Sequence, residues 1–249
     1  MSTALTACRT WLEAGLAFLY PQACQICGKA HATPEEGFVC PECWQNFRFI
    51  RPPFCERCGL PYPGEVTNAF VCANCHDTKL HFTRARSVIA AKGMALDIIH
   101  DYKYRRALWF EPLLADLLIR EAGPVLREER WDFIVPVPLH PMKEAEREFN
   151  QAERLARCLG RAVGIPVHTG FLRRTLATRT QTQLSREQRA KNVRRAFTPV
   201  PGVDCKGKRV VVFDDVLTTG ATTNACARVL KACGAREVCV WTLARGLLR

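Results

Sequence analysis

Two adjacent carboxylates and a loop of small residues form the clearest chemical signal in the sequence. Asp214 and Asp215 follow the apolar run Val210–Phe213, which predicts a buried strand, and a helix is predicted over Asn224–Lys231. The N–H groups of such a loop, with the dipole of the following helix, favour a phosphate. Two carboxylates suit sugar hydroxyls or Mg²⁺. The loop lacks the lysine of a P-loop, so we predict another kind of phosphate site.

Four Cys-x-x-Cys pairs form the second chemical signal. Eight of the 14 cysteines belong to them: Cys24, Cys27, Cys40, Cys43, Cys55, Cys58, Cys72 and Cys75. Two thiolates three residues apart can occupy adjacent corners of a zinc tetrahedron, and two such pairs complete a closed four-cysteine site. We therefore predict two structural Zn²⁺ sites with no open position for chemistry.

Two alternatives remain open for these cysteines. The gaps of 12 and 13 residues between successive pairs fit two zinc ribbons in tandem, but they also allow the first pair to combine with the third and the second with the fourth. A disulfide framework is the other alternative. The sequence shows no secretory signal, and six further cysteines are scattered along the chain, so we favour zinc.

Strands and helices alternate around the predicted phosphate site. The apolar run Trp131–Pro138 predicts a strand, which a loop over 139–151 connects to a helix with one apolar face: Ala152, Leu155, Ala156 and Leu159. With residues 210–231, this order predicts an α/β fold with a parallel sheet and crossover helices. Such sheets bind ligands at the carboxyl ends of their strands, so the 139–151 and 214–223 loops should open on one edge.

Further elements complete the predicted α/β part. We expect a strand over Arg86–Ala91 and a helix over Met94–Tyr104, with Leu96, Ile99 and Tyr102 on one apolar face. A second helix is predicted over Leu108–Ala122, ending near the following Gly-Pro pair. The final strand, Val238–Leu243, needs a neighbour in the sheet.

Positive charge is concentrated just before the phosphate loop. The net charge is +12, and residues 173–209 hold 11 Lys or Arg against two Asp or Glu. The polar first half of this segment predicts a mobile loop, and a short helix could begin at Ser185. The concentration of charge predicts an anionic partner, although a solvated surface loop would have the same composition. Its cations could cover a pyrophosphate (Arg186, Arg189 and Lys191) or grip a nucleic-acid backbone (Arg186, Arg189, Arg194 and Arg195).

Composition places the chain among ordinary globular proteins. Hydrophobic residues make up 48% of it and charged residues 24%, and no apolar run approaches the ~20 residues of a membrane span. We predict an N-terminal helix over residues 1–20, a double zinc ribbon over 21–80 and an α/β domain over 84–249. With no convincing signal peptide, we expect a cytoplasmic protein.

The run from Val210 to Thr223 resembles the phosphoribosyl pyrophosphate (PRPP) loop of type I phosphoribosyltransferases. A double zinc ribbon ahead of such a domain resembles the ComF (ComFC) family of competence proteins. The same family pattern, Val-Pro-x-Pro followed by a basic linker and Arg-Gly-Phe-Asn-Gln, is similar to residues 135–151. The resemblance covers nearly the whole chain and implies a type I phosphoribosyltransferase-like fold.

The resemblance also implies roles for individual residues. Asp214 and Asp215 would hold the ribose hydroxyls of Mg²⁺-bound PRPP as catalytic residues, and Lys103 lies where the ComF pattern has a Lys-Tyr pair. The 5′-phosphate would bind to the loop, in which the matching positions are Val216, Leu217, Thr218, Thr219, Gly220, Ala221 and Thr222. Glu148 stands where the family has Gly, and a carboxylate beside pyrophosphate would repel it.

The implied biological role is natural competence and DNA uptake. The sequence shows no pocket for an acceptor base, so the acceptor of any phosphoribosyl transfer stays open. One alternative is a single-stranded DNA-binding competence factor that works with the uptake machinery without phosphoribosyl transfer. Another is a zinc-dependent interaction module without ligand chemistry.

Overall fold

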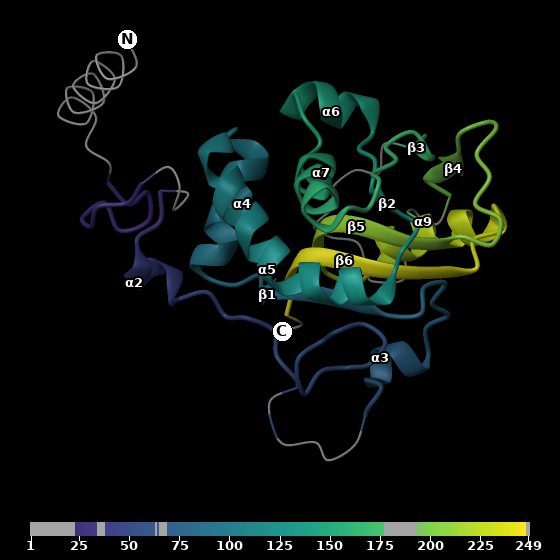
Figure 1. Ribbon diagram of the computed structural model, residues 1–249, viewed down its shortest axis with the longest axis horizontal. Helices are drawn as coiled ribbons and strands as arrows, with labels where there is room; N and C mark the ends of the chain where they lie inside the picture. The colour runs from purple at the N-terminus through teal and green to yellow at the C-terminus, as the bar shows by residue number, and fades with distance from the viewer. Residues whose placement is uncertain are drawn as a thin grey trace, which may run out of the picture.

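The computed structural model describes residues 23–33, 38–62, 64, 69–176, 193 and 195–247 (Figure 1). The N-terminal helix predicted over 1–20 lies outside the described residues. So do four of the predicted basic site residues: Arg186, Arg189, Lys191 and Arg194.

A four-stranded parallel sheet organises the α/β part, as the alternating sequence pattern predicts. Its order is β1 (Ala85–Ala90), β6 (Glu237–Arg245), β5 (Arg209–Leu217) and β2 (Phe133–Pro136). All three pairings are parallel. The last strand therefore finds two neighbours and lies in the middle of the sheet.

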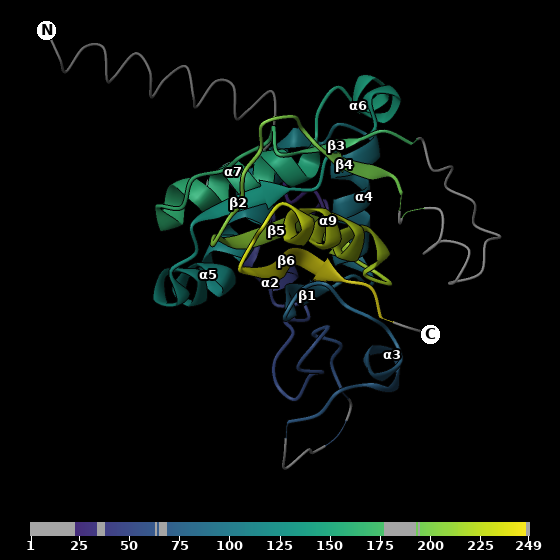
Figure 2. The same cartoon turned by 90° about the vertical axis from the view of Figure 1, so that its right-hand side faces the viewer.

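Helices cover both faces of the sheet, which explains why its strands are apolar on both sides (Figure 2). On β5, Val211 and Phe213 join the core formed with α5 and α7, whereas Val210 and Val212 join the core under α9. The helical segments are α4 (Met94–Tyr104), the 3-10 turn η1 (Leu108–Phe110), α5 (Glu111–Glu129), α6 (Pro141–Arg147), α7 (Gln151–Val163) and α9 (Ala221–Ala232). A two-stranded antiparallel ribbon, β3 (Leu172–Arg174) and β4 (Phe197–Pro199), flanks the undescribed basic segment.

Two local predictions were wrong. The second helix does not stop near residues 123–124, because α5 continues through Pro124 and buries Leu126. Packing against α7 therefore outweighs the hydrogen bond that the proline removes. Leu96 is 47% exposed, whereas Ile99 and Tyr102 lie on the buried face of α4 as predicted, together with Ala95 and Ile98.

The cysteine-rich segment wraps around the edge of the sheet. The first ribbon, residues 23–47, contains α2 (Pro41–Trp44), and the second, residues 54–76, contains α3 (Ala73–His76). Between them, Phe49 pairs with Ile89 as an antiparallel neighbour of β1. The two ribbons consequently contact different parts of the α/β structure (Figure 1).

Gly59 allows the second ribbon to approach β1. Its φ is +64°, and a Cβ atom there would lie 2.8 Å from the Ala85 carbonyl oxygen. The equivalent glycine of the first ribbon, Gly28, has φ +66° and nothing within 4 Å of such an atom. The close approach adds a requirement for glycine beyond the turn itself.

Alanine substitutions should separate these two requirements. Gly28→Ala should lower the free energy of unfolding by about 1–2 kcal/mol, the cost of a left-handed residue. Gly59→Ala should cost about 1–3 kcal/mol more, because the added methyl group meets backbone. Chemical denaturation of the zinc-loaded proteins measures the difference. Equal losses would show that the Ala85 contact has no energetic weight.

Within the part of the chain that the structure describes, none of the helices combines the length and the apolar composition needed to cross a bilayer.

Candidate functional site

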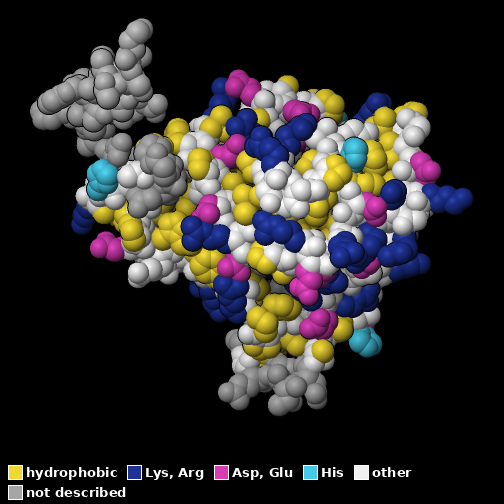
Figure 3. Space-filling view, in the orientation of Figure 1, with side chains coloured by type: hydrophobic (Ala, Val, Ile, Leu, Met, Phe, Trp, Pro, Cys, Tyr) yellow, Lys and Arg dark blue, Asp and Glu magenta, His cyan; other side chains and the backbone are white. Residues whose placement is uncertain are grey.

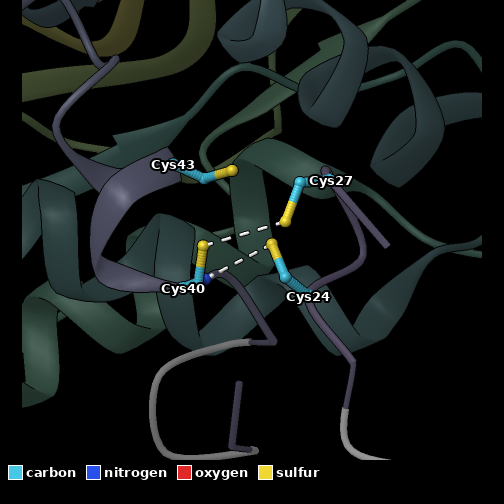
Figure 4. Close-up of side chains that lie close together, drawn as sticks. All are labelled: Cys24, Cys27, Cys40 and Cys43. Carbon is cyan, nitrogen blue, oxygen red and sulfur yellow. Dashed lines mark hydrogen bonds between the residues drawn. The ribbon is translucent and has the colours of Figure 1, made fainter. Parts of the chain in front are cut away.

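The eight cysteines of the four pairs gather in two groups of four, formed by successive pairs: Cys24, Cys27, Cys40 and Cys43, and then Cys55, Cys58, Cys72 and Cys75. The sulfur atoms of the first group point toward one another (Figure 4). In each group all sulfurs lie within 4.8 Å of one another, so the alternating combination of pairs is excluded. None of the described cysteines forms a disulfide.

The sulfur spacing fits zinc. Corners of a tetrahedron are about 3.8 Å apart when each Zn–S bond is about 2.3 Å. Cys27 Sγ and Cys40 Sγ lie 3.9 Å apart, and Cys58 Sγ and Cys72 Sγ lie 3.7 Å apart. The two ribbons share this geometry, which supports two structural four-cysteine zinc sites.

The electrostatics of the first cluster lead to the same conclusion. Burial raises the pKa of the Cys24 thiol, but backbone N–H donors from Cys27, Cys40 and Ile26 outweigh this effect and lower the pKa to about 6. Burial and the neighbouring sulfur atoms raise the pKa of Cys43 to about 12. Four thiolates can therefore coexist here only with a cation among them, which is the role of a structural zinc ion.

The paired carboxylates lie at the carboxyl end of β5, which extends beyond the predicted strand as far as Leu217. Asp214 Oδ1 accepts a hydrogen bond from the Asp215 N–H at 2.9 Å, and Asp215 Oδ1 accepts one from the Val216 N–H at 2.7 Å. The two carboxyl groups are thus oriented by their own strand. Asp215 is almost fully buried, and it needs a cation nearby.

Lys103 supplies that cation from α4. Its Nζ lies 2.5 Å from Asp215 Oδ2, and the exposed fractions of the two side chains are 16% and 7%. A lysine that only capped the helix end would point into solvent. The structure therefore brings Lys103 into the carboxylate site, although α4 and β5 are more than 100 residues apart in sequence.

Further cations surround Asp214. Burial raises the pKa of its carboxyl to about 6, and the charges of Lys103, Arg147 and Arg174 oppose the shift. Burial also lowers the pKa of Lys103 to about 8, which the Asp214 charge opposes. The site is a partly buried cluster of carboxylates and cations. Such a cluster can bind an anion together with polar hydroxyl groups.

The predicted phosphate loop connects β5 to α9. Gly220 caps the helix with φ +78°, and Thr219 Oγ1 accepts a hydrogen bond from the Ala221 N–H at 3.4 Å. Thr223 Oγ1 donates to the Gly220 carbonyl at 3.1 Å. Thr218 is exposed. The turn is tightly held by its own hydroxyl groups at the positive end of a 12-residue helix.

The β2–α7 connection contains the short helix α6, which the sequence pattern did not predict. Asn150 stabilises this connection through hydrogen bonds. Its Nδ2 donates to the Val137 carbonyl at 3.0 Å, and its Oδ1 accepts from the N–H groups of Ala152 and Glu153. The asparagine of the family pattern is thus a helix N-cap that also joins α7 to the end of β2.

Glu148 has a backbone conformation that explains the glycine found at this position in the resembling pattern. Its φ is +67°, a left-handed value that glycine adopts without strain. The side chain is 60% exposed and pairs with Arg106 at 2.8 Å. A neighbouring arginine therefore compensates the charge that the sequence alone suggested would repel pyrophosphate.

Two arginines near Asp214 did not emerge from sequence reasoning. Arg147 ends α6, and Arg174 ends β3 beside the undescribed basic segment. Arg147 lies within the sequence block that resembles the family pattern, which is the signal that could have identified it. Arg174 belongs to the basic stretch over residues 173–209, but its sequence does not distinguish it from the other cations there, because the β3–β4 pairing determines its position.

Comparisons with known proteins identify both parts of the chain. Residues 15–77 match the double zinc ribbon domain, and residues 152–247 match the phosphoribosyl transferase domain. Among solved structures, a purine phosphoribosyltransferase from Pyrococcus horikoshii aligns 53% of this chain with 83% of its own at 22% identity and a TM-score of 0.36.

Three curated relatives extend over most of the chain. A DNA utilization protein YhgH from Salmonella typhimurium is 31% identical over 91% of this chain and 98% of its own length. Competence protein F from Haemophilus influenzae is 29% identical over 84% of this chain and 97% of its own length. Competence protein ComFC from Bacillus subtilis is 27% identical over 83% of this chain and 84% of its own length. With its double zinc ribbon and phosphoribosyltransferase-like α/β fold, the chain belongs to this family of competence protein F, ComFC and YhgH proteins.

Proposed function

We propose that this protein binds PRPP, or a related phosphosugar, with Mg²⁺ at the carboxyl edge of β5. The observation that carries the proposal is the junction of three features on one strand end. Asp214 and Asp215 are oriented by backbone hydrogen bonds, the 218–220 turn leads into α9, and Lys103 pairs with Asp215. The end of β5 thereby combines acceptors for hydroxyl groups, donors for a phosphate and a buried cation.

Each feature has a role in this proposal. The Asp214 and Asp215 carboxylates accept hydrogen bonds from the ribose hydroxyls, and the turn together with the first residues of α9 binds the 5′-phosphate. Mg²⁺ would be held by these carboxylates and the phosphosugar, and it would neutralise charge on the pyrophosphate. Arg147 and Arg174, which act on Asp214, lie on the elements next to the expected pyrophosphate position.

Turnover is a further step of the same proposal. If the bound sugar reacts, pyrophosphate leaves C1 through an oxocarbenium-like state, and an acceptor nucleophile forms the new bond to C1. Cations that face the leaving group favour this step because negative charge grows there. Arg186, Arg189 and Lys191 remain the residues predicted to cover the pyrophosphate.

Calorimetric titration with PRPP and MgCl₂ tests the proposal. Wild-type protein should release heat on binding, and the Asp214→Asn/Asp215→Asn double variant should lose at least about 100-fold in affinity, since both hydroxyl-accepting carboxylates are neutralised. Asp214→Asn alone should fold normally, because burial already raises the pKa of Asp214 to about 6 and so disfavours its charged form.

The proposal fails if wild-type protein shows no PRPP-dependent heat, or if the double variant binds as well as the wild type. Thermal unfolding of each variant, recorded without PRPP, is the control for loss of structure.

The relatives suggest a second function in handling DNA, since their names refer to competence and DNA utilization. We propose that single-stranded DNA binds beside the phosphosugar site. Tyr104 is 54% exposed; the His100 ring lies next to it in a tilted arrangement, with ring centroids 4.7 Å apart, and the guanidinium group of Arg147 lies 4.6 Å from the centre of its ring. Exposed Arg105 follows directly. An exposed aromatic ring among cations is suited to stacking a base beside a bound backbone.

Basic side chains are spread widely over the α/β part on the face shown in Figure 3, with acidic side chains among them. Arg195 is exposed two residues before β4 and stays a predicted DNA contact. We also retain the prediction of a cytoplasmic protein as part of this proposal.

Fluorescence anisotropy with a labelled oligonucleotide tests this second proposal. Affinity should fall as salt rises, and Tyr104→Ala should weaken it about 5- to 10-fold, the usual value of one stacked base. Leu96→Ala, an equally exposed position on the same helix, is the matched control. Salt-independent binding, or equal effects of the two substitutions, would contradict the proposal.

A further inference from the structure

A buried arginine connects the second cysteine cluster to the phosphate loop. Arg245 is the last residue of β6 and is 4% exposed. Its Nη1 donates to the carbonyl oxygens of Leu217 and Thr218, at 2.8 and 2.5 Å, and to that of Gly246 at 2.7 Å. Its Nη2 lies 3.9 Å from Cys58 Sγ. One guanidinium group therefore touches both a zinc-ligating sulfur and the backbone at the start of the loop.

The other end of the loop is held from the same side. Asn224, in the first turn of α9, accepts a hydrogen bond from the His81 N–H at 2.7 Å and donates one to the Lys79 carbonyl at 3.0 Å. Residues 79–81 directly follow the second ribbon in sequence. The segment between Leu217 and Asn224 is thus fixed at both ends by contacts that depend on the position of that ribbon.

Little space separates the ribbon and the loop. The cavity between them measures about 20 Å³ and is lined on one side by Cys58 and Cys75 and on the other by Leu217, Thr218 and Gly220. A cavity of this size holds about one water molecule. A displacement of the turn around Cys58 would consequently move the loop backbone.

The first ribbon has no comparable connection. Cys24, Cys40 and Cys43 belong to the hydrophobic core that includes Leu113 of α5, and a surface groove between the ribbon and that helix is lined by Trp44 and Phe49. Among the described residues, no hydrogen bond joins the first cluster to the phosphate loop. The chain therefore contains two similar zinc sites, of which one supports the loop.

We propose that Arg245 is a positioning residue through which the second zinc site holds the phosphate loop in its binding conformation. A zinc-bound thiolate accepts a hydrogen bond from a guanidinium group more strongly than a neutral thiol does, so the metal fixes the orientation of Arg245. Arg245 in turn holds two loop carbonyls. The inference rests on the proposed function, because the loop is taken to bind the 5′-phosphate of PRPP.

Two cysteine substitutions at equivalent positions form the main experiment. Cys58→Ser should weaken the second site, and Cys27→Ser the first, and zinc content by mass spectrometry verifies each loss. Arg245→Lys keeps the positive charge but removes the planar guanidinium group, which can donate to several acceptors at once. Asn224→Ala removes the second attachment without changing a thiolate or a buried charge.

The first measurement is amide hydrogen exchange of the 218–224 segment in full-length protein without PRPP. Cys58→Ser, Arg245→Lys and Asn224→Ala should each speed exchange there at least about 10-fold, whereas Cys27→Ser should leave it unchanged. Exchange of β5 residues 210–213 serves as the control for global loss of structure. Equal exchange in Cys58→Ser and Cys27→Ser would overturn the proposal.

The second measurement is the affinity for PRPP with MgCl₂. The same three variants should bind about 10-fold more weakly than wild type, and Cys27→Ser should bind normally. Unchanged affinity in all three would also overturn the proposal. If wild-type protein binds no PRPP, the proposed function fails, and the exchange experiment still decides whether Arg245 joins the second zinc site to the loop.

Discussion

Removal of zinc by a strong chelator is expected to unfold both ribbons and to leave the central sheet folded. Each structural zinc site contributes roughly 10–16 kcal/mol in small zinc domains. Apolar burial contributes little to the second ribbon, since Cys55 and Cys75 are its buried side chains within the described part of residues 54–76. The sheet has its own apolar cores on both faces.

Metal analysis and hydrogen exchange together measure this result. The loaded protein should contain two zinc ions, and the stripped protein should lose exchange protection in residues 54–62 and 69–76. The first ribbon should retain more protection, because Val39 and Phe47 are buried in the same core as α5. Persistent protection of the second ribbon after complete loss of metal would contradict the assignment of a structural site.

Replacing Lys103 by methionine should destabilise the protein by about 3–5 kcal/mol, because it leaves a buried carboxylate without its cation. Asp215 is 7% exposed at its side chain, and Lys103 is the cation that contacts it at 2.5 Å. Urea denaturation at pH 7 gives the change in the free energy of unfolding. PRPP affinity should fall as well, since the carboxylates would no longer keep their orientation and charge.

Two variants establish the cause of that loss. The double variant Lys103→Met/Asp215→Asn should recover most of the stability but not the PRPP affinity, because position 215 then carries no charge and Asp214 still has the charges of Arg147 and Arg174. On the same helix, Arg105→Met removes an exposed pair with Asp101 and should cost less than about 1 kcal/mol. If Lys103→Met were as mild as Arg105→Met, the ion pair with Asp215 would not contribute to the fold.

Local patterns predicted those features whose physics is local. The helices at Met94–Tyr104 and Gln151–Val163 follow from apolar residues at helical spacing, and the strand before Asp214 follows from a β-branched run. The helix through Pro124 could not be predicted in this way. Its continuation depends on burying Leu126 against other elements, and local propensity does not contain that energy.

The sequence by itself determined the chemistry available to this protein. Four Cys-x-x-Cys pairs bind zinc because both ligands of a pair lie on one tight turn, and the Asp214–Asp215 pair with its threonine-rich loop is contiguous in the chain. Only the tertiary structure decided which cysteine pairs combine, that Lys103 reaches Asp215 and that Arg245 joins Cys58 to the phosphate loop. These contacts connect residues that are distant in sequence, and the packing of the sheet, helices and ribbons determines them.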